Sequence, residues 1–539
     1  MTDDGAASTA ESAASSANSA RAPGDGASRQ RALFMLLAIA LLLPHGLAVS
    51  FQNDDAFISY RYAKNWVDGH GLVFNPGERV EGYTNFLWTI LIGVFVKLGA
   101  DPLVVSKVLG FLASAGTIVV TARLAAHVSR AAGAPREAPG ELARGHRGLV
   151  DGVAPLLLAA WTPFAYWTFA GLEGPLFAFL LTLAVERAVA ERVATAGARD
   201  ASQRRGRGVA LGAILALLAL TRPEGVLFFA VFIAARLLAE RRAGIVSAVR
   251  GQLPFLIAFA ALYAPYFIWR ASYYGYLLPN TFYVRQGRSL AENLPLYKNG
   301  LLYLLAFLKE GGGILLAAPL VLAMRRPIAW SLALPAAVLA VALLYLIPVG
   351  GDSKIHFRFF VPVLPLLCVF AEAALGTIVS GAERAAVRAS SHRTRILAFA
   401  VVAVLALHLA SPSFAPPDKY EIDKTFFAML AEGGKWLARN APEGSTVACF
   451  AVGALPYYAG LPCYDLLGVT DARIAHGPLE AGKMTGHGKT DWDYILEKRP
   501  TFIFPMEGID LASAGYEYKP ISVRVDDEVL MLRTWRLRH

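Results

Sequence analysis

Long apolar runs recur along this chain of 539 residues, and they constrain its fold more than any other feature. A run of about 20 apolar residues can cross the hydrocarbon core of a bilayer as a helix. The chain is 55% hydrophobic and only 17% charged, whereas soluble domains carry about 25% charged residues. We therefore predict a polytopic α-helical membrane protein with about eleven transmembrane helices. The expected spans lie near residues 33–51, 103–122, 150–170, 174–190, 208–221, 225–240, 252–270, 311–324, 329–348, 360–380 and 396–412.

The start of the chain and two short apolar runs are not interpreted as membrane spans. Residues 1–30 are rich in Ala, Ser, Gly and Asp without apolar periodicity, which predicts a disordered cytoplasmic tail. The first apolar run follows this long polar tail and is as long as a span, so we interpret it as an uncleaved membrane helix. The runs 84–98 and 297–308 are shorter and flanked by Gly or charge, which favours re-entrant or interfacial segments.

Arginine residues cluster in alternate loops and predict the topology. Cytoplasmic loops carry an excess of Lys and Arg. All the Arg-rich segments are cytoplasmic if the N-terminus is inside and run 84–98 does not cross the membrane. These segments are 123–147, 187–207, 236–250, 325–326 and 384–395. We predict a multi-pass protein of the inner or plasma membrane whose first exported loop, 52–102, contains interfacial helices. Arginine residues in the cytoplasmic loops account for the net charge of +10. The sequence has no basic stripe of the kind that would indicate a nucleic-acid partner.

The last part of the chain has a different composition and predicts a separate domain. After a transmembrane domain at 31–412, residues 413–539 turn polar and mix strand-like with helical patterns, as in a small exported (periplasmic) α/β domain. The expected strands are Ser445–Phe450, Thr501–Phe504 and Glu528–Arg533, and the expected helices are Lys424–Asn440 and Asp491–Lys498.

Two cysteines, Cys449 and Cys463, lie in or beside strand-like runs of this domain. They could form a disulfide in an oxidising compartment. Two buried thiols are the alternative, and both interpretations stay open.

Asp54 and Asp55 follow the first predicted span and are the leading catalytic candidates. Adjacent carboxylates repel each other and must be solvated or paired, and a helix N-cap would need only one of them. A carboxylate within hydrogen-bond reach of an acceptor hydroxyl can act as general base. The pair could also bind a divalent cation such as Mg²⁺ or Mn²⁺, although two carboxylates alone do not establish any cofactor.

Cations at the predicted exported helix ends are candidates for binding an anionic leaving group such as a lipid phosphate. They are Arg61, Arg222, Arg285, Lys354, His356 and Arg358. Arg222 could instead pair with Glu224 beside a proline turn, and His356 and Arg358 could stabilise a turn after Gly350-Gly351-Asp352. No zinc-ligand spacing, Walker A motif or Rossmann glycine motif occurs, so nucleotide-driven transport is unsupported.

Several sequence segments resemble a known family. Asp54–Ala63, Gly69–Asn75 and Val80–Trp88 form the most specific block. Further matching segments are Thr221–Gly225, Pro279–Tyr283, Gly350–Asp352, Arg358-Phe359, Asp465–Asp471 and Gly486-His487. These segments resemble the GT-C superfamily of polyprenyl-phosphate-sugar-dependent glycosyltransferases, and more specifically the mycobacterial terminal β-(1→2) arabinofuranosyltransferase family.

The resemblance implies a GT-C-like fold and transfer of a sugar, arabinofuranose in that family, from a polyprenyl-phosphate donor to a cell-envelope glycan or lipid-linked acceptor. Asp54 or Asp55 would be the catalytic base. Donor-phosphate or substrate contacts would come from Tyr60, Arg61, Glu81, Tyr83, Asn85, Trp88, Glu173, Arg222, Glu224, Asn280, Tyr283, Arg285, His356 and Arg358. Inversion and retention at the anomeric carbon both stay open. The alternative functions are a transporter or flippase of lipid-linked sugars and a non-catalytic envelope scaffold.

Overall fold

The computed structural model describes most of the chain, with gaps at both ends and in several loops. The described residues are 25–132, 150–195, 201–323, 330–385, 391–414, 418–479, 486, 488–505, 509–526 and 528–538. Helix α2 begins at Asp25, within the predicted tail, and residues 1–24 lie outside the described part. His487 of the last resembling segment also lies outside it.

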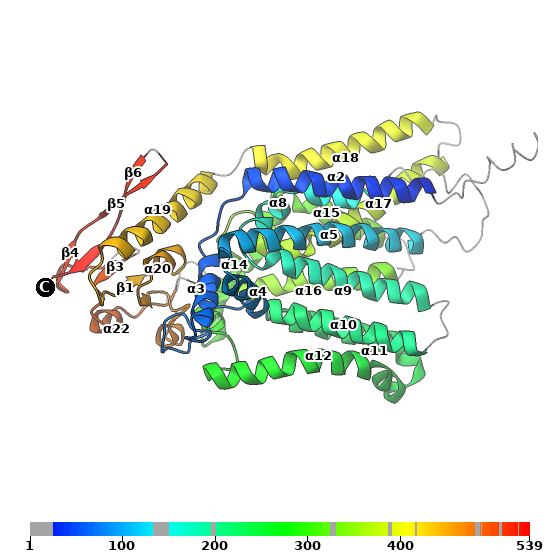
Figure 1. The fold of residues 1–539 in the computed structure, drawn as a ribbon. Helices are drawn as coiled ribbons and strands as arrows, with labels where there is room; N and C mark the ends of the chain where they lie inside the picture. Colours follow the sequence, from blue (N-terminus) through cyan, green and yellow to red (C-terminus); the bar gives the residue numbers. More distant parts are fainter. Residues whose placement is uncertain are drawn as a thin grey trace, which may run out of the picture.

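A bundle of long helices forms the larger part of the molecule (Figure 1). Its first half comprises α2 (Asp25–Val49), α3 (Ala56–Val67), α4 (Phe86–Lys97), α5 (Pro102–Ala132), α7 (Val153–Ala160), α8 (Thr162–Thr168), α9 (Gly174–Thr195), α10 (Ala201–Thr221) and α11 (Gly225–Glu240). The second half comprises η2 (Arg241–Ala243), α12 (Ile245–Tyr274), α13 (Asn280–Arg285), α14 (Leu290–Phe307), η3 (Leu308–Gly312), α15 (Gly313–Ala323), α16 (Trp330–Val349), η4 (Arg358–Val363), α17 (Leu364–Ala385) and α18 (Ser391–Phe414).

Within the described residues, five helical segments are long and apolar enough to cross a membrane. They are Ser28–Val49, Pro102–Ser129, Ile245–Tyr274, Ser331–Val349 and Arg358–Ile378. The other predicted runs lie in helices that are shorter, interrupted or charged: α7 and α8 separate at Trp161, and α9 includes Glu186 and Arg187. The chain is therefore a multi-pass membrane protein by its apolar helices, with fewer uninterrupted spans than the eleven apolar runs predicted.

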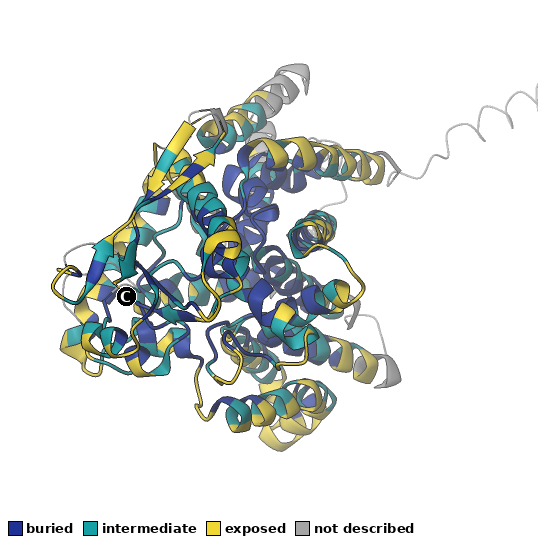
Figure 2. Cartoon of the chain, turned by 60° about the vertical axis from the view of Figure 1, so that its left-hand side comes forward, coloured by how far each residue is buried: buried dark blue, intermediate teal, exposed yellow. Residues whose placement is uncertain are grey.

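The outer surface of the bundle supports this assignment. Large apolar side chains are exposed along the outer helices, among them Leu36 (61%) and Leu47 (58%) on α2 and Ile257 (63%) on α12. Figure 2 shows a buried interior surrounded by helices whose outer faces are exposed. Exposed apolar faces of this extent are expected where lipid rather than water covers the protein.

Two short helices, α3 and α4, follow α2 and lie at the end of the bundle next to the C-terminal part (Figure 1). Helix α3 begins after Asp55 and ends before Gly69 and Gly71, whose positive φ values of 86° and 89° favour glycine. Helix α4 has 12 residues, about 18 Å at 1.5 Å per residue, which is too short to span a bilayer. The prediction that run 84–98 does not cross by itself agrees with this length.

The C-terminal part contains every described strand. It comprises α19 (Asp418–Asn440), β1 (Val447–Cys449), α20 (Ala454–Ala459), β2 (Cys463–Asp465), α21 (Ala472–Ala475), α22 (Trp492–Glu497), β3 (Phe502–Phe504), β4 (Tyr516–Tyr518), β5 (Ile521–Val525), β6 (Glu528–Leu532) and β7 (Trp535–Leu537). Five strands form a mixed sheet in the order β2-β1-β3-β7-β4, in which β1 is parallel to β2 and β3. Strands β5 and β6 form a separate antiparallel hairpin. The three predicted strands and two predicted helices are confirmed, and α19 begins six residues earlier than expected.

Candidate active site

Asp54 lies in the turn between α2 and α3 and contacts the loop that connects β1 to α20. Its Oδ1 accepts a hydrogen bond of 2.7 Å from the backbone N–H of Ala454, at the start of α20. The neighbouring Gly453 is in close contact: a Cβ built on it would lie 2.1 Å from the Asp54 carbonyl oxygen and 2.5 Å from its carboxyl carbon. The C-terminal part therefore holds one oxygen of this carboxylate by its backbone.

Asp55 is tied to two cations. Lys354 Nζ lies 3.2 Å from one carboxylate oxygen and Arg358 Nη1 lies 3.0 Å from the other. Arg358 Nε also contacts Asp352 at 2.7 Å. Burial alone raises the pKa of Asp55, but Lys354 and Arg358 outweigh it, so the pKa lies well below its usual range. Asp55 is an ionised structural partner of both cations.

Asp54 has a different electrostatic environment from its neighbour. Within the described residues it forms no ion pair. Burial raises its pKa to about 6, opposed by the Ala454 hydrogen bond and by the charge of Lys354, which lower it. Ionised Asp55 adds to the increase. The two carboxylates are thus distinct, and Asp54 can exchange a proton near neutral pH.

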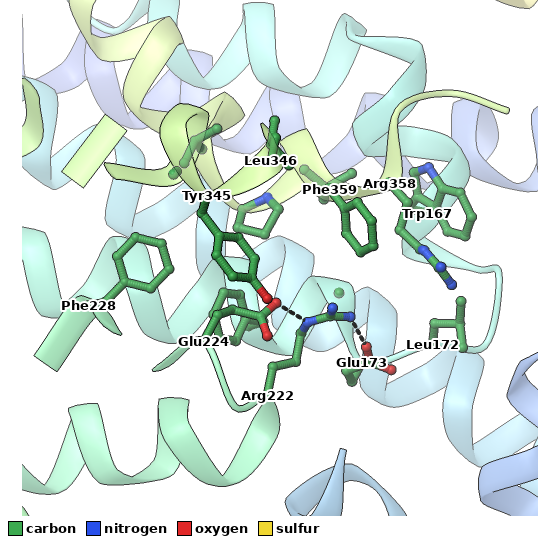
Figure 3. Close-up of a pocket in the computed structure, with 16 residues that line it drawn as sticks. Trp167, Leu172, Glu173, Arg222, Glu224, Phe228, Tyr345, Leu346, Arg358 and Phe359 are labelled. Carbon is green, nitrogen blue, oxygen red and sulfur yellow. Dashed lines mark hydrogen bonds and ion pairs between the residues drawn. The ribbon is translucent and has the colours of Figure 1, made fainter. Parts of the chain in front are cut away.

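A second charged group consists of Arg222 and two glutamates. Arg222 Nη1 donates to Glu173 at 2.5 Å, and its Nε donates to Glu224. Figure 3 shows this guanidinium between the two carboxylates, with Tyr345 above Glu224 and Arg358 beside Trp167. These groups line a pocket whose remaining walls are mostly apolar.

Three guanidinium groups gather around one aromatic ring of η4. Their central carbons lie 5.5, 5.7 and 5.3 Å from the ring centre of Phe359, for Arg222, Arg285 and Arg358 respectively. Arg285, at the end of α13, forms no hydrogen bond or ion pair with any described residue. Burial lowers the pKa of Arg285, and the charges of Arg358 and Arg222 lower it further, whereas Asp352 raises it. Around Phe359 and Asp55, therefore, Arg285 and Asp54 are left without an ion-pair partner in the described part of the chain.

His356 adjoins the pair but carries no charge at neutral pH, because burial lowers its pKa to about 4. Its ring centre lies 4.9 Å from that of Tyr166, and its carbonyl accepts a hydrogen bond of 2.9 Å from Trp167 Nε1. His356 and Phe357 have positive φ values of 57° and 47°, a conformation that non-glycine residues seldom adopt. This turn places Lys354 and Arg358 on either side of Asp55.

Several residues singled out in the segment 52–102 bind other parts of the protein instead of facing the carboxylate pair. Arg61 donates to the carbonyls of Phe74, Pro456 and Leu461 and to Asn75 Oδ1. The Tyr60 hydroxyl lies 2.6 Å from that of Ser106.

The other members of this group are paired in the same way. Glu81 forms a buried ion pair of 2.6 Å with Arg270, and the Tyr274 hydroxyl donates to that of Tyr83. Trp88 Nε1 donates to the Gly171 carbonyl. Asn85 Nδ2 donates to Glu173 at 2.8 Å and so links α4 to the Arg222 group.

Asn280 and Tyr283, on α13, contact the C-terminal part. Asn280 Nδ2 donates to the carbonyls of Gly468 (2.6 Å) and Val469 (3.0 Å). The Tyr283 ring lies 4.3 Å from that of His476, and its carbonyl accepts from Lys489. Because α13 ends at Arg285, these contacts position the unpaired guanidinium.

Cys449 and Cys463 lie on neighbouring parallel strands and are almost fully buried. Their sulfur atoms are 3.3 Å apart, beyond the bond length of about 2.05 Å. We expect the disulfide to form in an oxidising compartment, since a small approach of the sulfurs suffices. Maleimide labelling of the denatured, non-reduced chain should then find one thiol, that of Cys368, and labelling of all three would contradict the prediction.

The carboxylate pair does not fit a divalent cation. A magnesium or calcium site needs several oxygen ligands, yet Asp55 is occupied by two cations and one oxygen of Asp54 by a backbone amide. In the part of the chain that the structure describes, no group of three or more His, Cys, Asp or Glu side chains could hold a metal ion.

Sequence reasoning did not find Asp352, Trp167, Tyr345 or Gly453 as contributors to the site. Asp352 pairs with Arg358, Trp167 lies beneath its guanidinium at 5.8 Å, and Gly453 contacts Asp54. The Gly350-Gly351-Asp352 segment was the available signal for Asp352. No local pattern marks the other three, because their roles depend on contacts between distant segments.

The chain has a GT-C-like fold, which it shares with two solved structures over most of its length. ArnT from Cupriavidus metallidurans, in a structure bound to undecaprenyl phosphate, superposes with a TM-score of 0.54 at 14% identity, covering 94% of this chain and 97% of that one. The oligosaccharyltransferase AglB of Archaeoglobus fulgidus, in complex with an inhibitory peptide and a dolichol-phosphate, gives a TM-score of 0.53 at 12% identity, with 88% and 69% covered.

In sequence, the chain is distantly related to the terminal β-(1→2)-arabinofuranosyltransferase of Mycobacterium tuberculosis. The two are 28% identical over 254 residues, which is 45% of this chain and 36% of the mycobacterial protein. The chain thus matches about a third of the length of that relative. Residues 420–536 match a domain of unknown function, DUF8728.

Proposed function

We propose that this protein is a membrane glycosyltransferase that moves a sugar from a polyprenyl-phosphate donor to a cell-envelope glycan on the exported side of the membrane. The observation that carries the proposal is the unequal ion pairing around Asp55. It leaves Asp54 as a carboxylate that can take a proton and Arg285 as a cation that can bind an anion. A transfer from a phosphate-linked sugar needs one group of each kind.

The chemistry follows from these two groups. The acceptor hydroxyl oxygen forms a bond to the anomeric carbon of the donor sugar, and its proton passes to Asp54. The bond between the anomeric carbon and the phosphate oxygen breaks, and its electron pair stays on the phosphate. Arg285, with Arg358 beside it, stabilises that negative charge, because guanidinium groups bind phosphate oxygens through paired N–H donors.

The donor and its sugar are inferred from the relatives. ArnT and AglB, whose fold this chain shares, have structures with undecaprenyl phosphate and dolichol-phosphate bound. The mycobacterial relative is named for arabinofuranosyl transfer, which makes arabinofuranose the first donor sugar to test. The distribution of arginine among the loops supports an exported site, since it assigns the end of the bundle opposite to Asp54 to the cytoplasm.

A transfer assay tests the proposal. Membranes containing the full chain would receive radiolabelled polyprenyl-phosphate arabinofuranose and an arabinan oligosaccharide, with a nucleotide-linked sugar in a parallel reaction. We expect labelled oligosaccharide from the lipid-linked donor alone. Movement of intact lipid-linked sugar across proteoliposomes without transfer would favour a flippase and overturn the proposal.

Removing the unpaired cation should weaken donor use. In Arg285→Ala we expect the KM for the lipid-linked donor to rise about tenfold or more, because a charge-assisted hydrogen bond is worth about 1.5–3 kcal/mol. Arg524→Ala, on the exposed face of the β5 strand, is the matched control and should behave as wild type. An unchanged donor KM in Arg285→Ala would contradict the assigned role.

A further inference from the structure

One face of α19 borders the candidate active site. The Tyr420 ring lies 5.4 Å from that of Phe51, and the Phe427 ring lies 5.6 Å from that of Phe57. Phe51 and Phe57 flank the Asp54–Asp55 dipeptide on both sides in the sequence. Residues spaced by three and four along a helix share a face, so Asp423, three residues after Tyr420 and four before Phe427, faces the same region.

Asp423 is a half-buried carboxylate with no partner of its own. Within the described residues, it accepts no hydrogen bond and forms no ion pair. Burial raises its pKa, and the positive charges of Lys419 and Lys354 lower it. Lys354 is the same cation that pairs with Asp55 at 3.2 Å, so Asp423 lies within electrostatic reach of the site. Lys419 Nζ donates to the Ser353 carbonyl and fixes the start of α19 against the Lys354 turn.

The two sides of Asp55 differ in charge. Arg358 and the unpaired Arg285 gather around Phe359 on one side. On the other side the charge of Lys354 acts on Asp423, which shares a helix face with Tyr420. An anionic donor phosphate is attracted by the first group and repelled by the Asp423 carboxylate. The α19 side therefore fits an uncharged ligand that offers hydrogen-bond donors.

We propose that Asp423 binds a hydroxyl group of the acceptor glycan, with the Tyr420 ring packing against the same sugar. The inference rests on the proposed glycosyltransferase function. A carboxylate accepts hydrogen bonds from hydroxyl groups at both oxygens, and such charge-assisted bonds are strong. A tyrosine offers a broad apolar face together with a polar hydroxyl, which suits a sugar. Asp423 is thereby a specificity-determining residue that directs an acceptor hydroxyl toward Asp54.

Steady-state kinetics of the full-length protein test this role. In Asp423→Asn we expect the KM for an arabinan oligosaccharide acceptor to rise about tenfold, with the KM for the lipid-linked donor and the rate at saturating acceptor close to wild type. Glu421→Gln is the control, since the Glu421 side chain on the same helix is exposed. An unchanged acceptor KM, or a change in donor KM instead, would refute the proposal.

Direct binding separates this inference from the proposed reaction. The same oligosaccharide would be titrated calorimetrically into the detergent-solubilised wild type, Asp423→Asn and Glu421→Gln. Weaker binding by Asp423→Asn alone supports the acceptor site even if no sugar transfer is found, in which case only the proposed reaction fails. Equal binding by all three, or none by the wild type, overturns the acceptor site.

Discussion

Replacing Asp54 by asparagine is expected to lower the rate of sugar transfer by about 10²–10⁴-fold, the usual contribution of a general base. The amide keeps the shape of the side chain but cannot take the acceptor proton. Asp68→Asn, which removes an exposed carboxylate after the same helix, should retain wild-type activity. An Asp54→Asn variant with more than a tenth of the wild-type rate would exclude Asp54 as the base.

The pH dependence of the wild type identifies which carboxylate acts. Asp54 must be deprotonated to accept a proton, and burial raises its pKa to about 6. The rate should therefore fall below about pH 6 and level off above it. Asp55 stays ionised throughout this range because its pKa is lowered by Lys354 and Arg358. Asp55→Asn should reduce activity by releasing those cations, but its rate should still fall at acidic pH as in the wild type. If this acidic limb of the pH–rate profile disappeared in Asp55→Asn alone, Asp55 rather than Asp54 would be the base.

The sequence located the bundle, the sheet and the carboxylate pair because each has a local signal. Apolar runs have the length of membrane helices, and short apolar runs of strand length mark β1, β3 and β6. Uninterrupted spans were harder to predict. Apolar content alone does not predict the break at Trp161, which lies between the end of α7 and the start of α8 with its early Pro163.

The roles of individual charged residues depend on contacts between distant segments. Arg61 and Arg285 are equivalent candidates in the sequence, yet one donates to carbonyls of α20 and its loop while the other stays unpaired. The distinction between Asp54 and Asp55 has the same origin. It arises from Ala454 on one side and from Lys354 and Arg358 on the other, some 400 and 300 residues away along the chain. Sequence spacing could not supply this information.

Gly453 supports Asp54 through a close backbone contact, which makes it the sharpest test of whether the C-terminal part orients the catalytic carboxylate. A methyl group there would lie 2.1 Å from the Asp54 carbonyl oxygen and 2.5 Å from Oδ2. The carbonyl cannot retreat easily, because it accepts the N–H of Phe57 at 3.0 Å in the first turn of α3. Tyr457, on α20, packs on the fully buried Phe57 ring at 5.2 Å, so the loop cannot move away freely either.

Gly453→Ala is therefore expected to displace the Asp54 carboxylate and lower the transfer rate about tenfold or more while the protein still folds. Losing the Ala454 hydrogen bond removes an interaction that lowers the pKa of Asp54, so the acidic limb of the rate profile should move to higher pH. A merely structural defect would reduce the amount of active protein without moving that limb. Gly206→Ala, where an added methyl meets no atom within 4 Å, is the matched control. A wild-type rate and pH profile in Gly453→Ala would show that the C-terminal part does not orient Asp54.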